Sequence, residues 1–411
     1  MTGEHEVFID GFTHGGEGVA RIDGKAVFVA GAIPGERVRI RVVDDRKRWA
    51  RAHLLTVIEA NDDRVEPPCV YASECGGCDL QHVRPSAQRA LKTRVVREQL
   101  QRIGGIAAPP VDECRAVGPD LGYRTHAQFH VAPDGRLGFR RTASHEVVAV
   151  DECIVVNAAV QRVADQVAPT SAAKAAVRAH PSTDTAAVVL TPGREGLDVP
   201  GGEFDVLLEQ PDGRTVRLRG DGVLRERVAG ADFTFGASSF FQVNTAGATA
   251  LVDAVHDAIG TIDGDLVWDL YAGVGLLSIP LAAAGADVIA VESDSGAVAD
   301  AETNAVSNGV VVDVIHDDVA EVVARAANGD RAVDLPDVVV LDPPRSGAGP
   351  ATAANLAALA PGRIIYVACD VAALARDARV LEEHGYRLRN AVPLDLFPMT
   401  HHVEVVATFA P

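Results

Sequence analysis

Residues Leu266–Gly275 read LVWDLYAGVG, an apolar run that ends in a glycine-rich turn. The run is typical of a buried strand, and a helical pattern over Leu276–Ala284 follows it. The next segment, Asp287–Val291, is a second apolar run. Strand, glycine-rich turn, helix and strand in this order predict a parallel α/β unit, with a ligand beyond the carboxyl end of the first strand.

The same rhythm extends in both directions from this stretch. We expect helices at Ala246–Ile259 and Ser295–Asn308, and further strands at Val311–His316, Val338–Leu341, Arg363–Ala368 and Glu404–Phe409. Because the strands are almost continuously apolar, they must be covered on both faces. The pattern therefore predicts a parallel, doubly wound, Rossmann-like sheet.

Acidic residues end successive strands of this predicted sheet. Glu292 can hold two ribose hydroxyls, Asp317-Asp318 can meet an adenine amino group, and Asp342 ends the next strand. The turn lacks the third glycine of the dinucleotide fingerprint, which favours S-adenosylmethionine over a nicotinamide cofactor. A Gly-x-Gly pair also occurs in ordinary strand–helix turns, so this alternative stays open.

The N-terminal residues follow a different pattern. Short β-rich runs at Val7–Ile9, Ala26–Val29, Arg37–Val43 and Ala52–Ile58 are separated by Gly and Pro turns. Several short strands in residues 1–60 predict a small barrel of the OB type. A helix is expected at Arg84–Ile103, and short β-rich runs from about residue 115 to 235 predict a mainly β insertion.

Charge gives mixed indications about a nucleic-acid partner. The net charge of −19 argues against one, because phosphates need cations. Basic residues nevertheless cluster between Arg37 and Arg51 and between Arg89 and Arg102. These clusters are either RNA-binding patches or solvated faces.

Three of the six cysteines, Cys69, Cys75 and Cys78, lie close together, while Cys114, Cys153 and Cys369 stand apart. Such a cluster suggests a metal site before it suggests disulfides. A fourth thiolate would come from Cys114 or Cys153, both preceded by Asp-Glu. Spacing alone leaves zinc and an iron–sulfur cluster as alternatives.

Together these residues resemble the RNA uracil-5-methyltransferase family, in its form with an N-terminal TRAM domain and a [4Fe-4S] cluster. The matching motifs run nearly end to end: Gly15–Ala20, Pro34–Glu36, Cys69–His82, Phe241–Asn244, Asp269–Gly275, Asp342–Arg345, Tyr366–Cys369, Leu374–Asp377 and Phe397–Glu404. The resemblance implies a TRAM domain over 1–60, a small iron–sulfur domain over 61–85 and 114–238, and a class I methyltransferase domain over 86–113 and 239–411.

The resemblance also implies roles for single residues. Cys369 is the nucleophile, Glu404 the base, and Cys153 the fourth ligand of a [4Fe-4S] cluster. The positions expected to contact S-adenosylmethionine are Gln242, Tyr271, Leu276, Glu292, Asp318 and Asp342. The chain departs from common family residues at Ala272, Ala368 and Asp370, which differ around the glycine-rich turn and the nucleophile.

The chemistry explains why these residue types are needed. A thiolate that adds to carbon 6 of uracil activates carbon 5 for methylation, and a base must then remove the carbon-5 proton. The uracil must leave its stack to be reached, and Phe240, Phe241 or Tyr123 could stack on it. We expect ribosomal RNA as the substrate, and transfer RNA, a catalytically silent RNA-binding protein and a small-molecule methyltransferase are the alternatives.

The first ten residues carry three acidic side chains and no apolar core, and no apolar run reaches the roughly 20 residues that span a bilayer. We therefore expect a cytoplasmic protein with no membrane partner, and a monomer.

Overall fold

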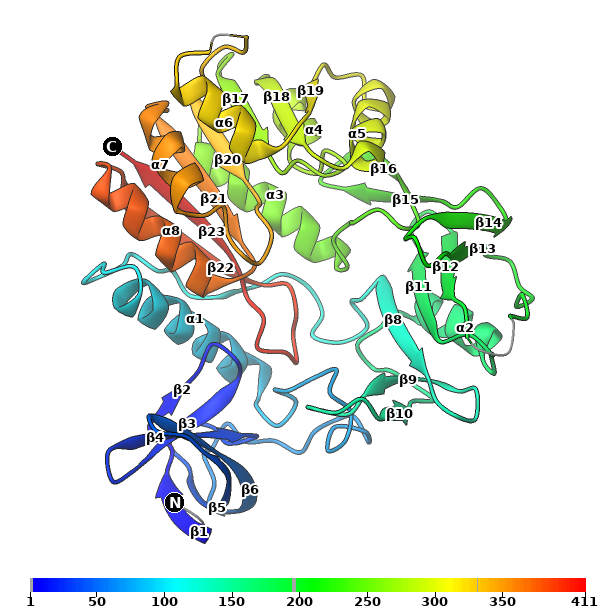
Figure 1. The fold of residues 1–411 in the computed structure, drawn as a ribbon, viewed down its shortest axis with the longest axis vertical. Helices are drawn as coiled ribbons and strands as arrows, with labels where there is room; N and C mark the ends of the chain where they lie inside the picture. The colour runs from blue at the N-terminus through cyan, green and yellow to red at the C-terminus, as the bar shows by residue number, and fades with distance from the viewer. Residues whose placement is uncertain (1–2, 194–196, 331) are drawn as a thin grey trace.

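The computed structural model describes residues 3–193, 197–330 and 332–411. The first two residues of the expected TRAM segment, residues 194–196 of the expected central segment and residue 331 lie outside these ranges. An N-terminal barrel, a central sheet and a C-terminal α/β region are distinct in Figure 1. Within the described ranges, no helix has the length and apolar character needed to cross a bilayer.

The N-terminal sheet has six strands in the order β1-β5-β6-β4-β3-β2. Their bounds are β1 Gly3–Phe8, β2 Gly11–Phe12, β3 Glu17–Ile22, β4 Lys25–Ala30, β5 Arg37–Asp45 and β6 Trp49–Glu59. Along β5, Val38, Ile40 and Val42 are buried and alternate with exposed arginines. This period of two places one face of each strand in the barrel core and the other in water.

The arginines that alternate with this core are paired with acids on neighbouring strands. Arg39 contacts Glu6 at 2.9 Å and Arg41 contacts Glu4 at 2.7 Å, both from β5 to β1. Arg37 and Arg51 have similar partners, Glu59 and Glu17. Exposed pairs of this kind contribute little to stability, so an anionic ligand can replace the carboxylates at small cost.

A central sheet of seven strands runs β10-β9-β8-β11-β12-β13-β14, and α2 (Ala158–Val167) packs on β11 and β12. The strands are β8 His126–Val131, β9 Leu137–Arg140, β10 Val147–Ala149, β11 Lys174–His180, β12 Thr185–Thr191, β13 Asp205–Glu209 and β14 Thr215–Arg219. Asn157 caps α2 by accepting a hydrogen bond from the Val160 N–H at 2.8 Å. The sequence predicted a mainly β insertion here and did not predict this helix.

Two pieces of the expected central segment, 114–238, pack against the C-terminal region. Strand β7 (Arg115–Ala116) pairs with β22 (Arg387–Asp395), and the hairpin of β15 (Val223–Val228) and β16 (Ala231–Gly236) shares a hydrophobic core with the large sheet. Phe233 and Phe235 of this hairpin are almost completely buried there. The domain boundaries stay a prediction, but these contacts set the central sheet itself apart from its flanking residues.

The C-terminal sheet has eight strands in the order β19-β18-β17-β20-β21-β23-β22-β7. Its remaining strands are β17 Leu266–Leu270, β18 Asp287–Glu292, β19 Asp313–His316, β20 Val338–Leu341, β21 Arg363–Ala368 and β23 Glu404–Ala410. The helices are α1 Pro85–Arg102, α3 Thr245–Ile259, α4 Ser278–Ala283, α5 Ser295–Ser307, α6 Val319–Ala327, α7 Pro350–Ala358 and α8 Val371–Glu383. One core contains side chains of α1, α6, α7 and α8, and the other contains side chains of α3, α4 and α5.

The expectation of a parallel sheet is confirmed for most of the strands and is wrong for one end of the sheet. Strands β17 to β21 pair in parallel, whereas β23 runs antiparallel to both β21 and β22. Residues 396–403 join β22 to β23 without a helix, and a connection that short reverses the chain into an antiparallel neighbour.

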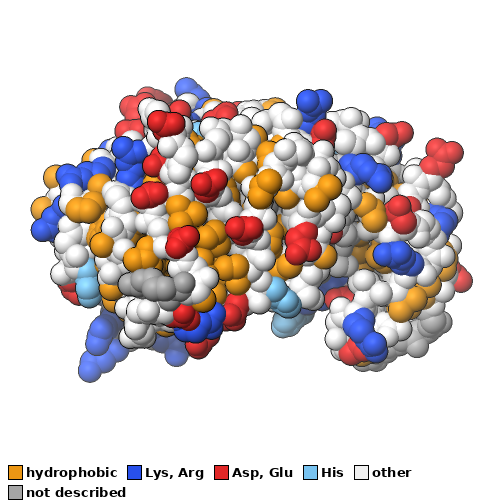
Figure 2. Space-filling model, turned by 90° about the horizontal axis from the view of Figure 1, so that it is seen from above, with side chains coloured by type: hydrophobic (Ala, Val, Ile, Leu, Met, Phe, Trp, Pro, Cys, Tyr) orange, Lys and Arg blue, Asp and Glu red, His pale blue; other side chains and the backbone are white. Residues whose placement is uncertain are grey.

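Charged side chains on the face shown in Figure 2 do not form one patch. Carboxylates are scattered across it, and most Lys and Arg side chains lie toward its two ends. This face therefore has no continuous surface of one charge sign.

A buried ion pair joins α1 to the large sheet. Lys92 Nζ lies 2.5 Å from Asp395 Oδ1 and donates a second hydrogen bond to the Phe397 carbonyl oxygen at 3.1 Å. Both side chains are almost fully buried, and Arg89 approaches the other Asp395 oxygen only to 3.7 Å. The pair therefore anchors α1 beside the loop that leads to β23.

We expect Lys92→Met to destabilise the protein by about 3 kcal/mol, because it leaves the Asp395 carboxylate buried without its closest partner. Arg387 lies on the same strand as Asp395, and Arg387→Met is the matched control. It breaks an exposed 2.7 Å pair with Glu382 of α8 and should cost at most about 1 kcal/mol. Urea denaturation midpoints measure both. Equal midpoints for the two variants would contradict a structural role of the buried pair.

Candidate active site

The antiparallel pairing of β21 with β23 brings together two residues far apart in the sequence. Ala368 is paired with Val405, so the next step of the register places Cys369 across from Glu404. Glu404 is only 3% exposed, and Cys369 keeps partial exposure. The expected nucleophile and the expected base thus lie at the same end of two adjacent strands.

The electrostatics of this pair confirm their proximity and involve two further residues. Burial and the neighbouring carboxylates of Glu404 and Asp342 raise the pKa of the Cys369 thiol to about 12, and Arg345 acts against this shift. Burial and Asp342 likewise raise the pKa of Glu404, again opposed by Arg345. Burial and the neighbouring negative charges therefore favour the protonated form of both groups, and a positive charge at the site favours their ionised forms.

Arg345 received no role from the sequence, although it ends the DPPR motif at Asp342–Arg345. It is exposed, and it is a cation that lowers the pKa of both Cys369 and Glu404. A cationic residue within a motif that carries a site carboxylate is the feature of the sequence that could have identified Arg345 as a site residue. An arginine beside a partly buried thiol is suited to stabilising the thiolate.

The glycine-rich turn after β17 is constrained by its own side chains. Tyr271 adopts a positive φ of 65°, a conformation that costs of order 1–3 kcal/mol for a residue other than glycine. Beneath it, the buried Asp269 accepts a hydrogen bond from Ser278 Oγ at the start of α4. The sequence assigned no role to Asp269, which holds the turn against the helix that follows.

Glu292 is oriented by the same turn. Its carboxylate accepts hydrogen bonds from the Gly273 N–H at 2.9 Å and from the Ser293 and Asp294 N–H groups at 2.7 Å. Ser293 Oγ adds a longer contact to Oε1 at 3.4 Å, whereas Oε2 accepts the Gly273 hydrogen bond and keeps a second lone-pair position for a further donor. The side chain is therefore fixed in direction and still able to accept a hydroxyl.

The structure distinguishes between the two acids at the end of β19. Asp317 is held in an ion pair with Arg325 at 2.6 Å. Asp318 accepts a hydrogen bond from the Glu321 N–H at 3.2 Å as the cap of α6, and its charge adds to burial in raising the pKa of Tyr271 to about 12. Asp318 therefore lies near Tyr271, on the ligand side of the sheet.

The other expected cofactor positions lie on different elements. Asp342 follows β20, and the Asp342 and Asp269 carboxyls both have pKa values raised to about 7, chiefly by burial. Leu276 packs partly buried against the second core. Gln242 is buried on the loop between β16 and α3, and its neighbour Phe241 stacks on Phe235 with ring centroids 4.4 Å apart. The expected contact of Gln242 with the cofactor rests on the family resemblance.

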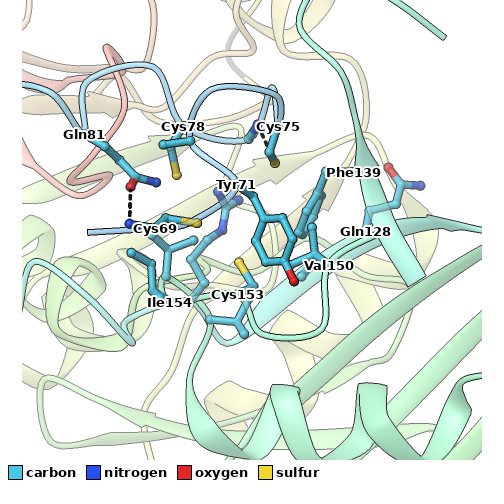
Figure 3. Close-up of a pocket in the computed structure, with 16 residues that line it drawn as sticks. Cys69, Tyr71, Cys75, Cys78, Gln81, Gln128, Phe139, Val150, Cys153 and Ile154 are labelled. Atoms are coloured by element: carbon cyan, nitrogen blue, oxygen red, sulfur yellow. Dashed lines mark hydrogen bonds between the residues drawn. The ribbon is translucent and has the colours of Figure 1, made fainter. Parts of the chain in front are cut away.

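Four thiols line one cavity of about 250 Å³ between the cysteine loop and the central sheet. Figure 3 shows the sulfurs of Cys69, Cys75, Cys78 and Cys153 around this space. The loop is held by a hydrogen bond from the Cys69 N–H to Gln81 Oε1 at 3.2 Å, and Cys75 Sγ accepts one from Gly77 at 3.4 Å. Burial, the first of several causes, raises the pKa of Cys78 to about 12.

In the described ranges no three His, Cys, Asp or Glu side chains lie close enough together to form a metal-ion site as they stand. Four thiolates are a donor set that zinc and a [4Fe-4S] cluster both use. Cys114 is excluded from the set, because it is buried near Lys92 and Asp395.

The sheet, the turn after its first strand and the barrel together define a class I S-adenosylmethionine-dependent methyltransferase with an N-terminal TRAM domain. A family model described as tRNA (Uracil-5-)-methyltransferase matches residues 207–409, and a TRAM domain model matches residues 4–55. The chain belongs to the TRAM-containing RNA uracil-C5 methyltransferase family, and it is an S-adenosylmethionine-dependent enzyme that acts on RNA.

Relatives support this assignment over the full length. An uncharacterized RNA methyltransferase of Streptomyces avermitilis is 39% identical over 100% of this chain and 99% of its own. A 23S rRNA (uracil(1939)-C(5))-methyltransferase of Acidithiobacillus ferrooxidans is 35% identical, covering 98% of this chain and 97% of its own. The structure of Pyrococcus abyssi tRNA (uracil-54, C5)-methyltransferase with S-adenosyl-L-homocysteine aligns with a TM-score of 0.79 at 25% identity, covering 98% and 99% of the two chains.

We expect S-adenosylmethionine to bind more tightly as pH rises from 6 to 8, by up to about tenfold, because the Asp269–Asp342 pair loses a proton near pH 7 and then attracts the sulfonium. Isothermal titration at each pH measures this. S-adenosylhomocysteine, which lacks the positive charge, is the control ligand and should show a flatter profile. Asp342→Asn should make the slope shallower, because Asp269 alone then loses a proton in this range, and a slope of opposite sign would contradict the interpretation.

Proposed function

We propose that this enzyme forms 5-methyluridine in 23S ribosomal RNA through a transient bond between Cys369 and carbon 6 of the uracil. The observation that carries the proposal is the pairing of β21 with β23, which sets Cys369 across from Glu404. The charges of Asp342 and Arg345, which follow β20, act on both residues and support the proposal.

Each protein group has one task in this reaction. The Cys369 thiolate adds to carbon 6, and the electron pair of the 5,6 double bond makes carbon 5 nucleophilic. S-adenosylmethionine supplies the methyl group that carbon 5 takes. Glu404 then removes the carbon-5 proton, and the returning electron pair expels the thiolate and restores the double bond. A carboxylate in a buried site is a stronger base once it is ionised, which suits Glu404 to this step.

The cofactor is proposed to lie along the carboxyl ends of β17 to β20. Glu292 would accept ribose hydroxyls, Asp318 would meet the adenine beside Tyr271, and Asp342 would face the sulfonium. Leu276 and Gln242 complete the set by family resemblance. The hydrogen bonds that fix Glu292 and the strained turn at Tyr271 support this placement, because a preformed site loses little entropy on binding.

The target base is proposed to leave its stack and lie against Phe240. Of the three aromatic candidates, Phe241 is buried in the core and Tyr123 is buried with its hydroxyl donating to the Pro398 carbonyl at 3.0 Å. Phe240 is 71% exposed and directly precedes the FQVN segment, so its ring is free to stack.

Ribosomal RNA is preferred over transfer RNA on the strength of the relatives. Two full-length relatives named as 23S rRNA (uracil(1939)-C(5))-methyltransferases are 35% and 33% identical to this chain. The P. abyssi enzyme named for tRNA uracil-54 is 25% identical. Its close structural match keeps the transfer RNA T-loop as the second candidate.

Labelled S-adenosylmethionine should transfer its methyl group to 5-methyluridine in unmodified 23S ribosomal RNA, and Cys369→Ala should abolish this transfer. Glu404→Gln should accumulate a methylated protein–RNA adduct, because the carbon-5 proton stays in place. Nucleoside analysis and denaturing gels measure the two outcomes. Unmodified transfer RNA is the control substrate, and label in transfer RNA alone would move the assignment to the second candidate. Label in 5-methyluridine with Cys369→Ala would refute the covalent route.

We further propose that Cys69, Cys75, Cys78 and Cys153 hold a [4Fe-4S] cluster. The four thiols around one cavity fit its donor set. Because methyl transfer moves no electrons, we assign the cluster a structural or RNA-binding role. It joins the loop at 69–78 to the central sheet through Cys153.

Anaerobically purified protein should contain about four iron and four sulfide per chain and absorb in the brown region, and Cys153→Ser should lose most of the iron. Cys114→Ser is the matched control, since it removes a thiol outside the cavity and should keep the iron. Iron and zinc analysis measures both variants. One zinc per chain without brown absorbance would overturn the cluster assignment.

A further inference from the structure

We propose that His14, from the N-terminal barrel, is a positioning residue for the nucleophile, because it holds the side chain of Asp370 next to Cys369. The inference rests on the proposed role of Cys369. His14 Nε2 lies 3.2 Å from Asp370 Oδ2, although the two residues are 356 positions apart. An RNA-binding domain thereby contacts the residue that follows the reacting sulfur.

Asp370 links the end of β21 to the start of α8. One carboxylate oxygen, Oδ1, accepts a hydrogen bond from the Ala373 N–H at 2.8 Å and caps the helix. The other oxygen faces His14. Burial favours the protonated acid, but the Ala373 hydrogen bond and His14 lower the pKa of Asp370 overall. The side chain is therefore a carboxylate held at both oxygens.

A carboxylate at this position carries a charge that an amide would not, and it gains from a hydrogen-bond donor at each oxygen. A carboxylate that is only partly exposed costs more free energy when one oxygen has no partner. His14 supplies the partner for the oxygen that the helix cap leaves free. Without it, Asp370 can turn toward water and leave the helix cap, and the backbone at Cys369 loses a restraint.

The turn that carries His14 is held in place by contacts other than the Asp370 bond. The Gly16 N–H donates to the Thr13 carbonyl at 3.1 Å, and the Glu17 N–H donates to Thr13 Oγ1 at 3.0 Å. Gly16 has a φ of 80°, and a Cβ there would lie 3.0 Å from His401 Cβ. The turn thus rests directly on the loop between β22 and β23.

The loop between β22 and β23 is itself held by the cysteine segment, residues 69–80. Asp79 accepts hydrogen bonds from the His401 backbone N–H at 2.8 Å and from the His401 ring, and the Asp79 and Leu80 N–H groups donate to the Met399 carbonyl. Removing the His14 ring therefore leaves the barrel seated on the loop. A substitution of His14 therefore tests its bond to Asp370 without displacing the barrel.

His14→Ala should lower the single-turnover rate of adduct formation with 5-fluorouridine-containing RNA by about tenfold at saturating RNA and S-adenosylmethionine, because a shift of about 1 Å at a nucleophile costs up to about a hundredfold. The affinity for both substrates should stay within about twofold. Because carbon 5 carries fluorine in place of hydrogen, the methylated adduct has no proton for the base to remove. The adduct therefore accumulates and is quantified on a denaturing gel. His53→Ala, an exposed histidine of the same barrel, is the matched control.

Asp370→Asn should rescue His14→Ala to within about twofold of Asp370→Asn alone, because the amide needs no histidine partner. If His14→Ala does not fold, His14→Phe keeps the ring volume, removes the hydrogen bond and should lose the same rate. Unchanged rates, or a failed rescue, would overturn the inference. Loss of RNA affinity alone would make His14 an RNA contact instead. Absence of adduct with the enzyme that carries no substitution would instead refute the role of Cys369.

Discussion

The antiparallel pairing of β21 with β23 is the constraint on which the candidate site depends. A parallel neighbour would place the carboxyl ends of both strands together, whereas this pairing sets the end of β21 against the beginning of β23. Cys369 leaves the sheet at the point where Glu404 enters it. The loop that precedes β23 then contacts the barrel and the cysteine segment, so all three regions meet around one thiol.

The sequence predicts the parallel part of the sheet closely, because those strands are buried on both faces and appear as continuous apolar runs. Leu266–Leu270, Val338–Leu341 and Arg363–Ala368 have the expected bounds. Strand β22 was not predicted, since RLRNAVPLD mixes charges with Pro393, and proline is rare within a sheet. Its place between β23 and β7, and hence the antiparallel end, depends on tertiary packing that periodicity does not record.

The site residues likewise fall into two groups: those that a local sequence motif identifies, and those whose role depends on contacts with distant segments. Cys369, Glu404 and the four cysteines of the cavity lie in motifs that the resemblance identifies. The importance of Arg345 and Asp269 comes from burial and from charges on other strands. The bond from His14 to Asp370 joins the barrel to α8, and no local pattern in the sequence indicates it. The departure at Asp370 acquires a physical reason only when its partner is seen.

The net charge overstates the repulsion that an RNA phosphate meets at this site. Asp269 and Glu404 are buried and Asp342 is partly buried, and the raised pKa values of all three favour the neutral acid over the charged form. A sulfonium at the sheet edge favours their ionised forms at the moment when a base is needed. On the barrel, exposed arginines are paired with acids that phosphates can displace at little cost. Burial at the site and weak pairing at the surface thus reconcile an acidic chain with an anionic substrate.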